Sequence, residues 1–364
     1  MLARTEAPSV TPKTTPTATQ RLLDAATSSL NSLLPPDWSL KVVNRSSTGG
    51  VIQLSASEGL TGKLSVLVCD RLVPKEAAVL PVPKEPAIVA ANWLSPRTRD
   101  LLTETGYGYI DQTGNTRVTV GRPGLVVLTD GAGRDPSPKP KQGPNIRGPR
   151  AWALLRTMAE VLPPYGVGEL AETIDANPGY ISRLLEAISN ELLIGRRPRG
   201  PVEHVEWQPV LRLMATSYSL LRSNETSNWV ASAGPNQLLE DLAGSGTRGW
   251  AVTGSFGAAP LVSVAAPEIA VVYADDPELI ANLTKLQPVR TGGNVVIARP
   301  YDQIVFKRTW NRDGITYASP AQIAVDCLTG PGRMPAEGDA LLEWMDRRAP
   351  SWQAVSLHQV ADQL

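Results

Sequence analysis

A proline- and glycine-rich segment, residues 131–149, interrupts the sequence and is unsuited to a regular helix or strand. Proline lacks a backbone N–H and fixes φ, and glycine makes regular structure entropically costly. Since 364 residues exceed the usual size of one domain, we expect this segment to link separately folded parts. The expected organisation is a disordered tail at 1–20, an α/β domain at 21–130, the linker at 131–149, a helical unit with a hairpin at 150–207 and a second α/β domain at 208–364.

Charge and composition exclude several classes of protein. The 35 basic residues balance the 35 acidic ones, so any basic surface must be local. The two cysteines, Cys69 and Cys327, lack metal-type spacing, and the two histidines, His204 and His358, are far apart. We therefore expect no metal, no cofactor and no disulfide framework.

The beginning of the chain carries no apolar core of a secretory signal, and no run reaches the ~18 apolar residues that a membrane span needs. Together with the rarity of cysteine, this favours a protein of the reducing bacterial cytoplasm that has no membrane partner.

Alternating strand-like and helical patterns predict an α/β fold on both sides of the central unit. The expected N-terminal helices are 21–34 and 95–105; Ser95 is suited to cap the second, and Gly106 to end it. The expected N-terminal strands are 40–43, 51–54, 64–69, 88–91, 118–120 and 125–128. The expected C-terminal elements are helices at 210–223, 236–243, 320–328 and 336–347, and strands at 250–253, 269–273 and 295–298.

Three successive apolar stripes predict three short helices between residues 150 and 190. In each stripe the apolar residues recur at i, i+3, i+4 and i+7, one face of a helix. Asp175 and Ala176 separate the last two stripes, and together the three helices form a helix-turn-helix arrangement. The stripes consist of Leu155, Met158, Ala159 and Leu162; Val167, Leu170, Ala171 and Ile174; and Ile181, Leu184, Leu185 and Ile188.

The third helix is the predicted reader of DNA. Asn177 is a favourable N-cap, and with the apolar stripe inward the outward residues near the N-terminus are Gly179, Tyr180, Ser182 and Arg183, followed by Glu186. Recognition helices contact bases mainly through their N-terminal residues. Gly179 permits close approach, and the other three side chains near the N-terminus offer hydrogen bonds to bases or phosphates.

A predicted hairpin after the third helix carries arginines at its tip. The three helices and this hairpin together predict a winged helix-turn-helix. The tip residues are Arg196, Arg197 and Arg199, which suit a phosphate backbone or a minor groove. The preceding linker adds further basic residues that suit neighbouring phosphates. They include Lys139, Lys141 and Arg147.

Seven short segments carry a family resemblance: 93–99, 106–111, 113–115, 163–167, 178–183, 252–256 and 326–333. They resemble actinobacterial proteins of the AbiEi family, the antitoxins and transcriptional regulators of type IV abortive-infection systems. The resemblance implies a winged helix that represses its own promoter at inverted repeats, and a C-terminal region that neutralises a nucleotidyltransferase toxin. This chain departs from the family in an additional α/β domain ahead of the winged helix.

The sequence supports two enzymatic functions less well than it supports DNA binding. The N-terminal domain is expected to be restriction-endonuclease-like, and Asp70 and Asp111 could share a site. Asp70 is followed by Arg71 and Leu72, however, so the D/E-x-K step of such nucleases is missing. The C-terminal domain is expected to be nucleotidyltransferase-like: it has the Gly254-Ser255 step, but after Glu268 the second acid is replaced by Ala270.

The sequence therefore predicts a non-enzymatic regulator of the nucleoid that binds repeated or palindromic double-stranded DNA. The alternative is a protein-interaction module such as an antitoxin, since winged helices also serve as docking units. An active nuclease or nucleotidyltransferase is the remaining hypothesis.

Overall fold

The computed structural model describes residues 16–133, 135–136, 146–197 and 199–361. The fold is mixed α/β, as predicted, with two large sheets of parallel and antiparallel strands. The chain divides into two compact units, residues 1–141 with 190–192, and residues 142–189 with 193–364. None of the described helices is both long and apolar enough to cross a bilayer.

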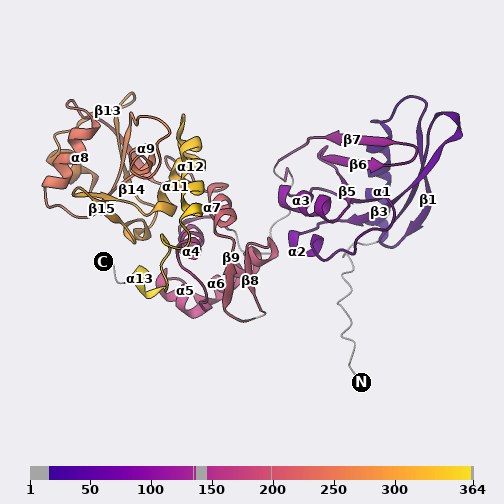
Figure 1. Ribbon diagram of the computed structural model, residues 1–364, viewed down its shortest axis with the longest axis horizontal. Coiled ribbons are helices and arrows are strands. Elements are labelled where there is room, and N and C mark those ends of the chain that lie inside the picture. Colours follow the sequence, from indigo (N-terminus) through magenta and orange to yellow (C-terminus); the bar gives the residue numbers. More distant parts are fainter. Residues whose placement is uncertain (1–15, 134, 137–145, 198, 362–364) are drawn as a thin grey trace, which may run out of the picture. The chain divides into compact units, whose positions relative to one another are not determined.

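The first unit is built on a seven-stranded sheet whose strands follow chain order (Figure 1). The pairs β3–β4 and β4–β5 are parallel and the other pairs are antiparallel. Its strands are β1 (Ser39–Ser46), β2 (Gly49–Ser55), β3 (Thr61–Cys69), β4 (Ala87–Ala91), β5 (Gly108–Asp111), β6 (Thr116–Val120) and β7 (Leu125–Thr129).

Helices cover the two faces of this sheet unequally. Helix α1 (Pro16–Asn31) packs on one face through Leu23, Ala26 and Leu30. Helices α2 (Pro74–Ala77) and α3 (Pro96–Glu104) form a smaller core with the other face, around Leu94 and Leu102. The short helix η1 (Ser57–Gly59) joins β2 to β3.

The second unit begins with three helices and a hairpin. Helix α4 (Pro149–Glu160) is followed by α5 (Val167–Thr173) and α6 (Pro178–Asn190), and strands β8 (Ile194–Arg196) and β9 (Val202–Val205) pair antiparallel. The apolar stripes predicted for these helices face inward, and the last one is almost completely buried.

A second seven-stranded sheet forms the rest of this unit, in the order β13-β10-β14-β12-β11-β16-β15. The pairs β12–β14 and β11–β16 are parallel. The central strands β11 and β12 are buried on both faces. The strands are β10 (Glu225–Val230), β11 (Trp250–Thr253), β12 (Ala270–Ala274), β13 (Gln287–Val289), β14 (Val295–Arg299), β15 (Trp310–Arg312) and β16 (Ile315–Tyr317).

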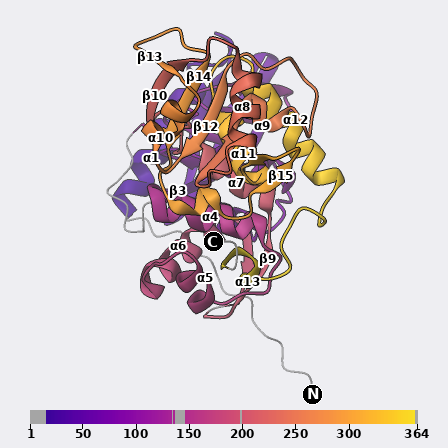
Figure 2. The ribbon, with the colours of Figure 1, turned by 90° about the vertical axis from the view of Figure 1, so that its left-hand side faces the viewer.

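The helices of this unit pack around the second sheet and close back onto the first three helices (Figure 2). Helices α9, α11 and α12 pack together, α8 contacts β16, and α13 contacts α5. These elements are α7 (Trp207–Ala215), α8 (Pro235–Gly244), α9 (Gly254–Ala258), α10 (Pro277–Leu283), η2 (Gln303–Phe306), α11 (Pro320–Thr329), α12 (Met334–Arg347) and α13 (His358–Ala361).

One hydrophobic core runs through the whole second unit, from Ala151 to Val360. It crosses the expected domain boundary at residues 207/208, because α7 begins at Trp207 and packs directly on α4. Helix α4 is buried on all sides, whereas its sequence predicts a single apolar stripe. The helical segment and the C-terminal α/β segment are therefore joined through a shared helix.

Candidate nucleic-acid interface

The turn between α5 and α6 is set by a capping motif at the end of α5. Asp175 adopts the left-handed conformation with φ of 49°. The Asp175 N–H donates to the carbonyl of Glu172, and the Ala176 N–H donates to that of Ala171. These two bonds end α5 in the Schellman arrangement and reverse the chain within a few residues. The tight turn predicted at Asp175 and Ala176 is confirmed.

The N-terminus of α6 is closed by Asn177, as predicted. Its Oδ1 accepts hydrogen bonds from the N–H of Gly179 at 2.8 Å and of Tyr180 at 3.4 Å. Pro178 has no N–H, and the Ile181 N–H donates to the Asn177 carbonyl. The first turn therefore has few amides left for an external anion, and any ligand there must be held mainly by side chains.

The outward face of α6 presents the predicted side chains. Ser182 and Arg183 are exposed, as is Gly179, while Tyr180 is half-buried. Burial raises the pKa of Tyr180, so its hydroxyl remains a proton donor near neutral pH. A methyl group at position 179 would lie 3.8 Å from Nη1 of Arg183. The absence of a side chain at Gly179 thus leaves space beside the Arg183 guanidinium.

The hairpin beside α6 is bulged and is joined by a third chain segment. The register shifts between Gly195 and Arg196, and the N–H and C=O of Tyr165 pair with those of Val202. The Tyr165 hydroxyl donates to the carbonyl of Met158 at the end of α4. The hairpin is therefore tied to the loop between α4 and α5.

The three hairpin arginines differ in their surroundings. Arg197 lies within 3.2 Å of the Glu203 carboxylate, and its side chain is largely exposed. Arg199 is exposed on the turn, with φ of 59°. Arg196 is half-buried, and its Nη1 is enclosed without a hydrogen-bond partner among the described residues. Arg197 and Arg199 are therefore the two accessible cations of the hairpin.

The basic residues expected from the linker are only partly described. Arg147 is exposed just before α4. Lys139 and Lys141 lie outside the described residues. Arg150, at the start of α4, is already engaged, because its guanidinium contacts Asp175 at 3.0 Å and Asp302 at 3.1 Å.

Acidic residues outnumber basic ones across this helical segment. Between residues 149 and 207 the sequence has six arginines and eight carboxylates. On α5, Glu169 and Glu172 are exposed, and Asp175 follows in the turn. The positive charge is thus confined to the start of α6, the hairpin turn and Arg147, rather than spread over the surface.

A buried ion pair anchors α4 to the rest of the second unit. Nε of Arg156 lies 2.9 Å from Oε1 of Glu160, and both side chains are almost fully enclosed. The Arg156 guanidinium also donates to the carbonyls of Ile304 and Lys307, and the Ser319 hydroxyl donates to Glu160. This network fixes α4 against η2 and the start of α11.

The C-terminal segment closes on the loop that follows α4. The N–H of Ala354 donates to the Glu160 carbonyl, and the N–H of Leu162 donates to the Ala354 carbonyl, both at 2.8 Å. Trp352 makes an edge-to-face contact with Trp207, with ring centroids 5.0 Å apart. The support of α5 and α6 thus includes residues from the far end of the sequence.

Comparisons with known proteins were made at the level of family models, curated sequences and solved structures. No match to this chain was found. The geometry of the outward face of α6 and of the hairpin is therefore the basis on which a function is assigned.

The acids considered for a nuclease are engaged in local hydrogen bonds. Asp111, at the end of β5, is buried and accepts bonds from the N–H of Leu94 and from the backbone and side chains of Thr113 and Asn115. Asp70 accepts a bond of 2.6 Å from Asn92. Within the described residues, no group of three or more histidine, cysteine, aspartate or glutamate side chains is arranged to hold a metal.

The serine and the acid considered for nucleotidyl transfer each contact another partner. Gly254 turns from β11 into α9 with φ of 62°, and the Ser255 hydroxyl donates to the Glu337 carboxylate at 2.6 Å. Glu268 precedes β12 and is exposed, 3.7 Å from Arg333. The strand that follows it begins at Ala270, so no second acid joins it there.

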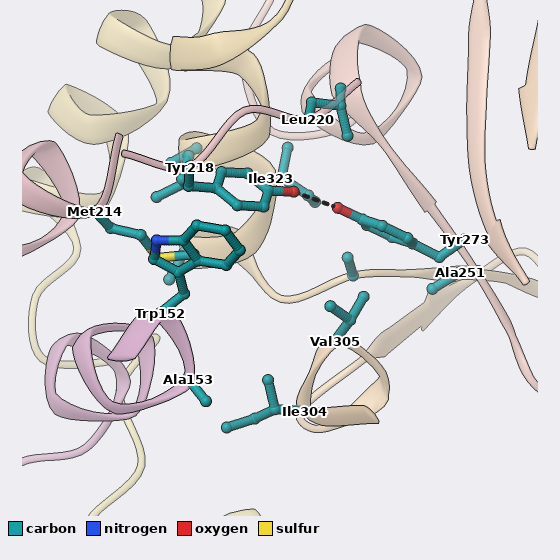
Figure 3. Close-up of a cluster of buried hydrophobic side chains, with 14 of the residues drawn as sticks. Trp152, Ala153, Met214, Tyr218, Leu220, Ala251, Tyr273, Ile304, Val305 and Ile323 are labelled. Atoms are coloured by element: carbon teal, nitrogen blue, oxygen red, sulfur yellow. Dashed lines mark hydrogen bonds between the residues drawn. The ribbon is translucent and has the colours of Figure 1, made fainter. Parts of the chain in front are cut away.

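Sequence reasoning missed a buried polar cluster around Asp326 on α11. Its carboxylate accepts bonds from Thr253 at 2.6 Å, Tyr218 at 2.7 Å, Tyr273 at 2.9 Å and Gln322 at 2.9 Å. Figure 3 shows the Tyr218 and Tyr273 rings meeting through their hydroxyls among apolar side chains. The one available signal was an isolated acid, one turn after a glutamine, in the apolar helix at 320–328.

Proposed function

We propose that residues 149–207 form a winged helix-turn-helix that binds double-stranded DNA, and that the protein is a sequence-specific transcriptional regulator. The observation that carries this proposal is the exposed surface of α6. Its apolar stripe is buried, while Gly179, Ser182 and Arg183 face outward beside a hairpin that exposes Arg197 and Arg199. A helix of this kind fits the major groove, and its N-terminal residues meet the base edges.

The outward residues divide into two roles. Arg183 suits a bidentate contact to guanine, and the Ser182 and Tyr180 hydroxyls suit bases or phosphates. Because Asn177 already engages the first amides of α6, base recognition falls to these side chains. The two accessible hairpin arginines and Arg147 suit the phosphate backbone, with Lys139 and Lys141 of the linker as further contacts.

The resemblance to the AbiEi family supports a repressor that acts at repeated or palindromic sites in the bacterial nucleoid. A two-fold site pairs two copies of the reading helix about one helical turn apart. In this proposal the first unit has a restriction-endonuclease-like core and the C-terminal part a nucleotidyltransferase-like core. The parallel strands β3–β4–β5 and the turn from β11 into α9 support these fold assignments.

The test compares three proteins by DNA selection followed by binding in a salt series: the wild type, Arg183→Ala, and Arg197→Ala with Arg199→Ala. The Arg183 variant is expected to lose preference at one base position, at a cost of about 1–3 kcal/mol. The double variant is expected to weaken binding to all sequences alike and to flatten the salt slope by about two units.

A matched control replaces Arg248 and Arg290, which are exposed elsewhere in the second unit. This control is expected to bind like the wild type. The proposal fails if the wild type selects no sequence, or if the control and the hairpin variant behave alike.

Protein docking is a second candidate, and the charge of α5 favours it. Glu169, Glu172 and Asp175 form an acidic surface that repels phosphates and suits a basic protein partner such as a nucleotidyltransferase toxin. Glu169→Gln with Glu172→Gln separates the two candidates. The double variant should bind DNA more tightly if α5 faces phosphates, and should release a co-purifying partner if α5 is a docking surface.

A further inference from the structure

In the first unit, β1, β2 and the start of β3 carry more basic than acidic side chains on the face opposite α1. Strands β1, β2 and β3 contain Lys41, Arg45 and Lys63 and no aspartate or glutamate. Helix α1 covers the opposite face, where Ile52, Leu54 and Leu64 are buried. Lys41 and Lys63 are exposed.

The strand register aligns these lysines. Lys41 lies opposite Gln53 in the β1–β2 pair, and Gln53 lies opposite Lys63 in the β2–β3 pair. Neighbouring strands are about 4.8 Å apart, so the two lysine backbones are separated by about 10 Å. A parallel row of hydroxyl side chains lies next along the strands. It consists of Ser39, Ser55 and Thr61.

A third cation, Arg122, lies next to the start of β3. A Cβ at Gly62 would lie 2.3 Å from the carbonyl oxygen of Arg122, so only glycine permits this contact. The contact places the turn after β6 beside the start of β3. Lys63 and Arg122 then line a hollow of about 570 Å³, together with Gln53, Thr61 and one acid, Glu85.

These cations are free to bind a ligand, whereas a neighbouring one is not. Arg45 forms an ion pair with Asp24 of α1. Among the described residues, Lys41, Lys63 and Arg122 have no ion-pair or hydrogen-bond partner for their side chains. We define these three residues as the sheet-face cations.

We propose that the sheet-face cations bind the phosphate backbone of double-stranded DNA as a second contact, independent of base sequence. Three unpaired cations and a row of hydroxyls match the charge and hydrogen-bonding groups of phosphates. Strands β1 to β3 carry no aromatic side chain, so they lack the stacking platform that single-stranded nucleic acids use. This contact goes beyond the reading function proposed for α6.

The test uses the full chain and a long random-sequence DNA duplex, with binding measured over a salt series. The variant is Lys41→Gln, Lys63→Gln and Arg122→Gln together. It is expected to reduce the salt slope by two to three units and to weaken binding about tenfold at physiological salt. The matched control is Arg71→Gln, Lys75→Gln and Arg97→Gln, three exposed cations of the same unit.

The Arg183→Ala protein is measured in parallel, with DNA selection as an additional readout. If the salt slope of the sheet-face variant is unchanged while Arg183→Ala still alters base preference, the second contact is refuted and the proposed reading function of α6 is not. Equal losses in the variant and its control, or tighter binding of wild type to single-stranded RNA than to the duplex, also overturn it. Normal melting curves for both triple variants exclude misfolding.

Discussion

Arg156 and Glu160 form an ion pair one turn apart on α4, and only 1 % and 2 % of their side chains are exposed. Removing one partner leaves a buried charge uncompensated, which typically costs about 3–5 kcal/mol. We expect Arg156→Met to lower the free energy of unfolding by that amount, as measured by urea denaturation. Arg347→Met is the control, because it breaks a pair with Glu343 at the same i,i+4 spacing that is mostly exposed. Its expected cost is below about 1 kcal/mol, and equal losses would contradict the assigned role.

The buried carboxyl of Asp326 makes stability depend on pH. Burial raises its pKa from 3.8 to about 6, against the opposing effect of its hydrogen bonds. A raised pKa means that the folded protein holds this proton more tightly, so the contribution is full below pH 4 and is lost as pH rises to about 6. Relative to Asp326→Asn, the wild type should lose roughly 3 kcal/mol of unfolding free energy between pH 4 and 7. A constant difference between the two proteins across this range would refute the assignment.

Gly179 is expected to matter for binding rather than for folding. Gly179→Leu should stay within about 1 kcal/mol of the wild type in stability, because the helix preference of leucine offsets a contact of its Cβ, 3.1 Å from Oδ1 of the capping Asn177. Its side chain would fill the space beside the Arg183 guanidinium and weaken DNA binding at least tenfold. Thermal melting and gel-shift titration measure the two effects. Tight binding by a stable Gly179→Leu protein would contradict the placement of DNA at this site.

Two substitutions of Asn177 separate the effect of capping α6 from the effect of a negative charge at this position. Asp caps a helix as well as Asn does, so Asn177→Asp should leave the melting temperature unchanged. The added negative charge would face the proposed DNA site and should weaken binding several-fold at low salt. Asn177→Ala should instead cost about 1 kcal/mol of stability. Identical behaviour of the two variants in both measurements would argue against this division.

Glu203 is expected to restrain Arg197. In the proposed complex its carboxylate would compete with DNA phosphates for the guanidinium, so Glu203→Gln should tighten DNA binding by about two- to fivefold. The effect should fade at high salt, where both interactions are screened. Glu240→Gln on α8, an exposed acid in the same unit, is the control and should have no effect. Weaker binding by Glu203→Gln would show that the carboxylate positions Arg197 instead.

Local sequence signals predicted much of the secondary structure and the outward face of α6. The Ser95 cap and Gly106 bound α3 as expected, and the strand predicted at 250–253 agrees with β11. The helix predicted at 210–223 was too long, because α7 ends at Ala215. Strand β5 was missed, since it spans only Gly108–Asp111 and has few strongly apolar residues.

Long-range packing explains what the sequence did not predict. One side of α4 carries the polar residues Arg156, Thr157 and Glu160, and such residues predict a solvent-exposed side. In the structure, residues from far along the chain enclose it. The sequence likewise predicts that Arg196 is exposed at the hairpin tip. In the structure it lies at the bulge, and Nη1 of its guanidinium is buried. Such burial depends on elements brought together only by tertiary structure, and periodicity does not encode it.

The backbone bonds between Ala354 and the end of α4 have a consequence for protein synthesis. During translation α4, α5 and α6 leave the ribosome long before residues 352–360, which complete their shared core. The polar side of α4 also waits for Ile304, Lys307 and Ser319, which enclose Arg156 and Glu160. A nascent chain that stops short of Trp352 thus lacks part of the core that supports α5 and α6, and these helices gain their full packing only when residues 352–360 emerge.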